Sequence, residues 1–136
     1  MKIVLDTNIL LISLPKKSPF RPIFDAIRTG LIQVGISSEI LLEYEEILIR
    51  KTSSGVAENV IKILVNLENV HHQDIYFNWN LIQSDADDNK FVDCALAFSA
   101  DFRVGNDKHF DILKSIDFPK LAVIPADKLL DLISKL

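Results

Sequence analysis

Cysteine is nearly absent from this 136-residue chain, which contains Cys94 alone. One cysteine cannot form an internal disulfide, and it cannot build a cysteine-based zinc site. The three histidines, His71, His72 and His109, lack the spacing of paired metal ligands, so a zinc centre is not expected. The chain also offers no Ser/His or Cys/His pair suited to nucleophilic catalysis. These absences direct the search for chemistry to other side chains.

Long hydrophobic runs are missing as well. No apolar stretch approaches the roughly 18 residues that a membrane-spanning helix needs. The first residues also lack the layout of a signal peptide, because Asp6 interrupts the apolar stretch and no small-residue cleavage site follows. We therefore expect a cytosolic protein with no membrane partner. The mean hydropathy of +0.22 is nevertheless high for a soluble chain, which hints at an apolar surface used for association.

The chain has no excess of basic residues. Its formal net charge is −4 and its pI is about 5.3, whereas nucleic-acid-binding proteins usually carry a positive balance. An acidic chain can still bind polyanions when its basic residues cluster, or when bound metal ions reverse the local field. The net charge therefore neither supports nor excludes a nucleic-acid substrate.

Apolar patterns typical of strands and helices alternate along residues 1–136, without a linker, repeat or low-complexity segment. Strands are expected at 3–5, 31–36, around 70, 102–104 and 121–124. Helices are expected from about 23 to 30, at 38–51 with Ser37 as the N-cap, at 91–100 and at 126–136. Another helix is expected after a break at 53–55, and its apolar face includes Val60, Ile61, Leu64 and Leu67. Loops are expected before the first helix, where Pro15 and Pro19 lie, and at 77–89. Alternation without hairpin signals predicts a single α/β domain whose parallel sheet is covered on both faces.

Acidic residues gather where the predicted strands end. Asp6 follows Ile3–Leu5, a run so apolar that it is typical of a strand buried on both faces. Asp107 follows the strand at 102–104, and Asp88 directly precedes the apolar pattern of the next helix along from the polar loop. Parallel strands bring their carboxyl ends to a common edge, where open α/β sheets place their ligands. We therefore expect these three acids to share one edge of the sheet.

The other acids leave alternatives open. Helical periodicity over 38–51 places Glu43 at one rim of the apolar face and Glu45 at the other, so geometry does not choose between them. Asp93 falls almost opposite the apolar face of its helix and is expected to be solvated. Asp85 is interpreted as an acid of the loop that precedes this helix.

Each acid at the sheet edge also has an explanation that requires no chemistry. Asp88 and Asp107 can cap helices, and Asp6 can brace a turn. Several carboxylates in one cleft cannot all be ionised without a counter-charge, however, so protonation or a divalent metal must intervene. Mg²⁺ and Mn²⁺ prefer oxygen ligands. Such a site suits hydrolysis of a phosphodiester by a water that the metal activates.

Four stretches of sequence carry these acids in order along nearly the whole chain: LDTNIL at 5–10, EILLEYEEIL at 39–48, DADDNKFVDCALAFSADF at 85–102 and NDKHF at 106–110. Together they resemble the PIN-domain family, with a spacing similar to that of VapC-like toxin components of bacterial toxin–antitoxin pairs. The resemblance implies a three-layer α/β/α sandwich with a parallel, about five-stranded sheet. It also implies cleavage of single-stranded RNA with Mg²⁺ or Mn²⁺, a homodimer, and silencing by a cognate antitoxin.

The resemblance assigns roles to individual residues. The acids that it implies for metal binding and catalysis are Asp6, Glu43, Asp88 and Asp107, so it selects Glu43 over Glu45. Residues that are expected to support these acids, or that are held in reserve, are Asn8, Asn106, Asp85 and Asp93. Basic residues close to the acids in sequence are the candidates for contacts with RNA phosphates at the rim of the site: Lys90, Arg103 and Lys108.

Three rival interpretations differ in class. A haloacid-dehalogenase-like phosphatase needs a second Asp two residues after the first, and this chain has Asn8 there. A receiver domain needs a phospho-accepting Asp at the end of a central strand, and after the strand near residue 70 only Asp74 is close. A degenerate PIN domain that binds RNA or protein without cutting is the serious rival. It gains support from Gly105, because many relatives carry Thr or Ser two residues before the last acid.

Overall fold

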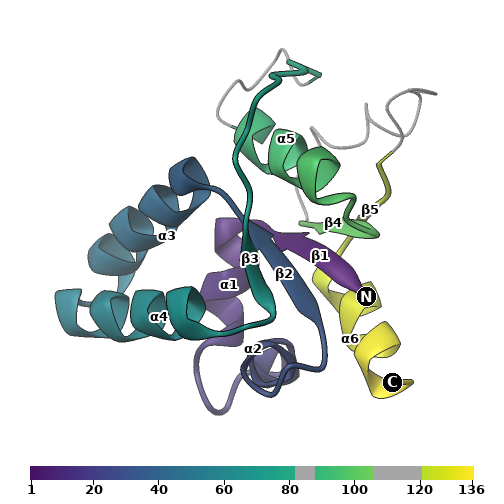
Figure 1. The fold of residues 1–136 in the computed structure, drawn as a ribbon. Helices are drawn as coiled ribbons and strands as arrows, with labels where there is room; N and C mark the ends of the chain where they lie inside the picture. Colours follow the sequence, from purple (N-terminus) through teal and green to yellow (C-terminus); the bar gives the residue numbers. More distant parts are fainter. Residues whose placement is uncertain (82–87, 106–120) are drawn as a thin grey trace.

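Strands and helices alternate along the chain in the computed structural model, which describes residues 1–81, 88–105 and 121–136 (Figure 1). Within these ranges the strands are β1 (Lys2–Leu5), β2 (Gln33–Ile36), β3 (Val70–His72), β4 (Phe102–Val104) and β5 (Val123–Ile124). The helices in the same ranges are α1 (Thr7–Ser13), α2 (Arg21–Arg28), α3 (Ser38–Lys51), α4 (Ser54–Asn66), α5 (Asn89–Phe98) and α6 (Ala126–Ser134).

The strands of the described residues form one parallel sheet in the order β3-β2-β1-β4-β5. β1 is central, and its register sets Ile3 opposite Val34 of β2 and Leu5 opposite Val104 of β4. The chain moves outward from β1 to β3 and then crosses to β4 on the other side of β1. The strand order therefore reverses between β1 and β4, the kind of point where open α/β sheets bind ligands. The predicted parallel sheet is confirmed.

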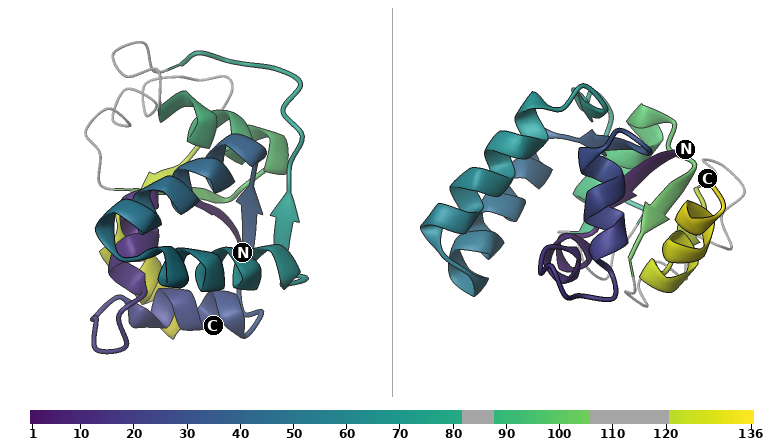
Figure 2. Two further views of the ribbon diagram at one scale, coloured as in Figure 1. Left: turned by 90° about the vertical axis from the view of Figure 1, so that its left-hand side faces the viewer. Right: turned by 90° about the horizontal axis from the view of Figure 1, so that it is seen from below.

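Helices cover both faces of this sheet, as the resemblance implied (Figures 1 and 2). On one face α5 packs against β1, β2 and β4, and on the other α2 packs against α1 and α6. α3 and α4 lie side by side as a hairpin, with α3 touching α1 and α5 and α4 touching β3. The three-layer arrangement brings the amino end of α5 and the middle of α3 towards the edge where β1 ends.

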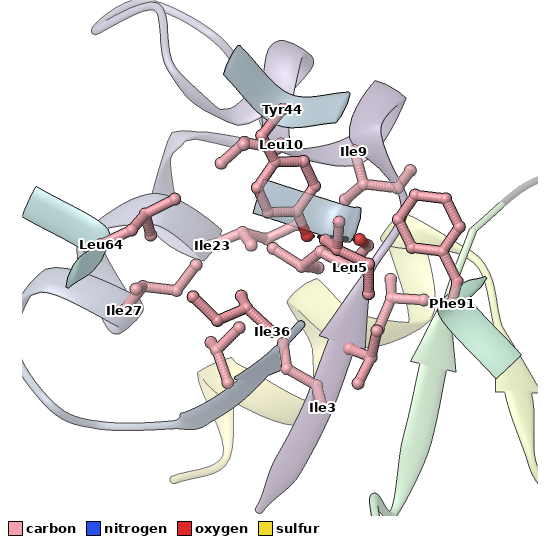
Figure 3. Packing of buried hydrophobic residues seen from close by; sticks show 14 of the residues in the cluster. Ile3, Leu5, Ile9, Leu10, Ile23, Ile27, Ile36, Tyr44, Leu64 and Phe91 are labelled. Atoms are coloured by element: carbon pink, nitrogen blue, oxygen red, sulfur yellow. Dashed lines mark hydrogen bonds between the residues drawn. The ribbon is translucent and has the colours of Figure 1, made fainter. Parts of the chain in front are cut away.

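The core is built around β1, whose residues Ile3, Val4 and Leu5 are at most 1% exposed. Tyr44 of α3 inserts into this core, and its hydroxyl donates a hydrogen bond to the carbonyl oxygen of Leu5 at 2.6 Å (Figure 3). A buried tyrosine needs such a partner for its hydroxyl. The bond ties α3 to the last residue of β1, so the residue before Tyr44, Glu43, is brought to the same place as Asp6.

Two local predictions are wrong. The loop expected after the first strand contains α1, a helix of seven residues that starts directly behind Asp6. Its apolar residues, Ile9–Ile12, follow the polar residues Asp6–Asn8 as one short unbroken run, which does not show a helical period. The break expected at 53–55 is shorter, because Ser53 caps α4 by accepting the Val56 N–H at 3.1 Å and Gly55 lies inside the helix.

The remaining elements match the sequence patterns closely. α3 covers the predicted 38–51, and the Ser37 hydroxyl accepts the Ile40 N–H as its cap at 3.3 Å. β4 also has its predicted bounds, whereas β2 and β5 are shorter than the apolar stretches from which they were predicted. Strong amphipathic patterns and polar caps are local signals, which explains why they were read correctly.

Candidate functional site

Asp6 stands at the carboxyl end of β1, beside the switch point of the sheet. Its backbone N–H donates to the carbonyl oxygen of Val104 at 2.9 Å, and its own carbonyl accepts from Ile9 and Leu10 of α1 at 3.1 Å. The backbone of Asp6 is therefore fixed both to β4 and to the first turn of α1. Its side chain is 16% exposed, so the carboxylate faces solvent only in part.

The surroundings of Asp6 have opposing effects on the pKa of its carboxyl group. Burial raises the pKa of the Asp6 carboxyl above its ordinary 3.8, and the nearby Glu43 carboxylate raises it further. The Arg103 guanidinium and the backbone N–H groups of Asn8 and Thr7 act in the opposite sense. Asn8 thus supports Asp6 through its main chain, while its side chain is exposed. Asp6 is an acid kept in surroundings that favour its neutral form.

Glu43 of α3 is held from two sides. The buried Thr7 hydroxyl donates a hydrogen bond to Glu43 Oε2, and the Lys90 ammonium lies 2.8 Å from Glu43 Oε1. The Glu43 side chain is 25% exposed, whereas Glu45 is an exposed residue. Glu43 thus lies at the edge where β1 ends, and its selection over Glu45 as a site residue stays a prediction. The bond from Thr7 to Glu43 had no signal in the sequence.

Asp88 and Lys90 open α5, the helix that packs across β1 and β4. Asp88 occupies the N-cap position, but in the described part of the chain its side chain makes no capping hydrogen bond. Lys90 pairs through its ammonium with Glu43, and its predicted contact with RNA phosphate stays a prediction.

Arg103 was predicted at the rim of the site, and this is wrong. Its side chain is fully buried, with the guanidinium 4.6 Å from the centre of the Phe91 ring and Nη2 4.0 Å from Asp6 Oδ1. Its Nη1 also donates to the carbonyl oxygen of Val104. A signal was present in the sequence: a charged residue inside a short apolar strand of a buried parallel sheet requires an internal partner.

Asp93 was predicted to be solvated, and this too is wrong. It is 5% exposed and accepts the Trp79 backbone N–H at 3.0 Å. Residues 73–81, which follow β3, pass beside α5, and Trp79 is one of them (Figure 1). Burial raises the pKa of Asp93, and Glu39 adds to the rise. Asp93 anchors this segment, and no contact places it with Asp6 or Glu43.

The other predicted site residues, Asp85, Asn106, Asp107 and Lys108, lie outside the described residues, so their roles stay predictions. Within the ranges that the structure describes, no three His, Cys, Asp or Glu side chains come close enough together to hold a metal. The chemistry of Asp6 and Glu43 still fits a hard cation, since both offer carboxylate oxygens at one edge. Mg²⁺ commonly takes only one or two carboxylates and fills its remaining positions with water.

Comparison with known proteins gives the same picture of the fold. The PIN domain family model matches residues 2–109. Among solved structures, VapBC from Salmonella typhimurium bound to DNA superposes with a TM-score of 0.63 at 18% identity, covering 93% of this chain and 98% of that one. VapBC2 from Rickettsia felis, bound to a DNA fragment from its promoter, gives 0.62 at 16% identity, with 92% and 98% covered. VapBC-1 from Haemophilus influenzae gives 0.62 at 18%, with 93% and 99% covered. No curated protein sequence matches significantly.

Proposed function

Because the chain belongs to the PIN-domain family, whose members are generally nucleases, we propose that it is a metal-dependent endoribonuclease acting on single-stranded RNA. The observation that carries the proposal is the meeting of Asp6 and Glu43, which lie on different elements and are linked through Thr7 at the switch point of the sheet. A parallel sheet places ligands at this edge. Burial raises the pKa of Asp6, so the charge of its carboxylate is not what stabilises the fold at this edge.

The resemblance to the family suggests the roles of the residues. Asp6, Glu43 and Asp88 would hold Mg²⁺ or Mn²⁺ directly or through water, with Asp107 helping to hold it or a second ion. Bound there, the cation would lower the pKa of a water molecule and draw charge from the phosphate. Thr7 orients Glu43, and Lys90 balances its charge beside the path of a substrate phosphate.

The proposed setting is a toxin–antitoxin pair in the cytosol, with this chain as the toxin. Support comes from the VapBC assemblies that share its fold. Exposed apolar side chains on the α3–α4 hairpin would suit association with an antitoxin or a second copy: Leu42, Ile49, Val56 and Val65. In the described ranges, no helix is long and apolar enough to cross a membrane.

The test compares the wild type with an Asp6→Asn/Asp88→Asn double variant. Mn²⁺ is titrated into each by calorimetry, and each is incubated with a mixed-sequence single-stranded RNA. We expect the wild type to bind Mn²⁺ and cut, and the double variant to lose cleavage by about two orders of magnitude or more. Asp127→Asn/Asp131→Asn, with the same charge change on exposed residues of α6, is the matched control. Cleavage that survives in the Asp6/Asp88 variant would refute the assignment.

A second function is favoured by one observation. Arg103 lies beside Asp6 and Lys90 lies on Glu43, so internal cations already offset two of the acids. Acids whose charge is already offset by neighbouring cations are expected in a catalytically weak or degenerate domain that binds RNA or protein. Affinity for RNA that is independent of metal, with no cleavage of any RNA tried, would establish it in place of the nuclease.

A further inference from the structure

The guanidinium of Arg103 is an internal part of the acid site. It lies between the ring of Phe91, 4.6 Å away, and the carboxylate of Asp6, 4.0 Å away, and the side chain has no exposed surface. A guanidinium keeps its proton at every physiological pH, so its positive charge is permanent. Buried in this position, Arg103 cannot reach out to a substrate phosphate. Its charge acts on the site itself.

Gly105 makes the room that the guanidinium occupies. A Cβ atom at residue 105 would lie 2.8 Å from Nη1 of Arg103, 3.3 Å from Cβ of Asp6 and 3.4 Å from Oδ2 of Asp6. A side chain at 105 and the guanidinium therefore compete for the same space beside Asp6. The two positions on and after β4 form a matched pair, in which glycine allows arginine to reach the carboxylate.

From this arrangement we propose that the fixed positive charge of Arg103 beside Asp6 weakens the affinity of the acid site for divalent cations. The proposal rests on the proposed function only in treating the acids as a cation site. A cation bound to Asp6 would have to enter beside a fixed positive charge, and like charges at such distances repel strongly in a partly buried site. The site therefore binds its metal more weakly than its carboxylates alone would.

The test measures Mn²⁺ affinity by calorimetry at pH 8 for every variant. Arg103→Met removes the charge and keeps an apolar side chain of similar length, and we expect it to bind Mn²⁺ more tightly by on the order of tenfold. Arg103→Lys keeps the charge and should stay within about threefold of the wild type. A gain in affinity separates this role from a merely structural one, because damage to the fold would weaken binding.

Two further variants serve as a second test of the proposal and as its control. Gly105→Ala keeps the charge but forces the guanidinium away from Asp6, and it should tighten Mn²⁺ binding less than Arg103→Met does. It serves as the primary variant should Arg103→Met not fold.

Arg21→Met is the matched control. Arg21 also lies over an aromatic ring, that of Phe24 at 5.2 Å, and beside a carboxylate, that of Asp25 at 3.0 Å. Its helix, α2, carries none of the acids of the proposed site. Arg21→Met should leave Mn²⁺ affinity unchanged.

The outcomes separate this proposal from the nuclease itself. If Arg103→Met gains affinity, the proposal holds even where the wild type fails to cut RNA, and only the proposed function falls. If the wild type cuts RNA but both Arg103→Met and Gly105→Ala bind Mn²⁺ with wild-type affinity, the nuclease stands and the role of Arg103 is overturned. Failure of every variant to bind Mn²⁺ overturns it as well.

Discussion

At the scale of single residues, Asp6 shows a conflict between folding and chemistry. Its carboxyl group has a raised pKa because burial disfavours the charge, and Arg103 offsets only part of that effect. The neutral form of Asp6 therefore favours the folded state. The stability that comes with this neutral form is fully present below the unfolded pKa of about 3.8 and is lost as the pH rises through the higher folded pKa.

This pH dependence of stability gives a prediction for Asp6→Asn, which mimics the neutral form of the carboxyl group. The variant should be more stable than the wild type at pH 7, and the difference should vanish below pH of about 3.8. Urea denaturation followed by circular dichroism between pH 3 and pH 8 measures it, with the exposed Asp127→Asn as control. A variant less stable than the wild type at pH 7 would mean that the Asp6 carboxylate is a structural group.

Thr7 gives a second prediction at this scale, because its buried hydroxyl holds Glu43. Thr7→Val keeps the shape but removes the donor, and should lower the free energy of unfolding by about 1 kcal/mol. If the proposed nuclease is correct, cleavage of RNA should fall as well. Thr7→Ser keeps the hydroxyl and should retain most of both. Equal behaviour of the valine and serine variants would show that the bond to Glu43 contributes nothing.

At the scale of elements, β2 and α5 meet at Gly35 with no space to spare. A Cβ atom there would lie 2.6 Å from Cδ2 and 2.9 Å from Cγ of Phe98. Gly35→Ala should therefore destabilise the fold by about 1–3 kcal/mol, as overpacking does. Gly55→Ala is the matched control, because in α4 the added carbon meets only Ser53 Oγ at 3.9 Å. It should stabilise by about 0.5–1 kcal/mol. Thermal unfolding of both variants tests the contrast.

Elements also show how far the sequence could lead. α3 and β4 were predicted with their bounds, since amphipathic periodicity and a serine cap are local features. α1 was not predicted because its apolar run, Ile9–Ile12, is too short to show a helical period. Asp6 could be named from the residues, whereas helical periodicity could not separate Glu43 from Glu45. A charge inside the strand at 102–104 signalled an internal partner for Arg103, but its neighbours Phe91 and Asp6 meet it only after folding. Asp93 was misjudged because the segment that covers it belongs to no regular element.

At the scale of the whole molecule, an acidic chain is proposed to act on a polyanion. With a net charge of −4, the long-range field does not attract RNA, and we expect cations bound at the acids to reverse it locally. The affinity for single-stranded RNA should be higher in Mn²⁺ than in EDTA by about tenfold. Stopped-flow fluorescence anisotropy, read before cleavage proceeds, measures it. Tighter binding in EDTA than in Mn²⁺ would contradict this account.

The order of the strands has a consequence for how the protein is made. β1 leaves the ribosome first, yet its neighbour β4 is synthesised about a hundred residues later. Asp6 therefore emerges before Val104 and Arg103, which support it in the folded protein. A nascent chain cannot assemble the acid site until these residues have emerged. If the protein cuts RNA, it stays harmless to the message from which it is being translated until that point.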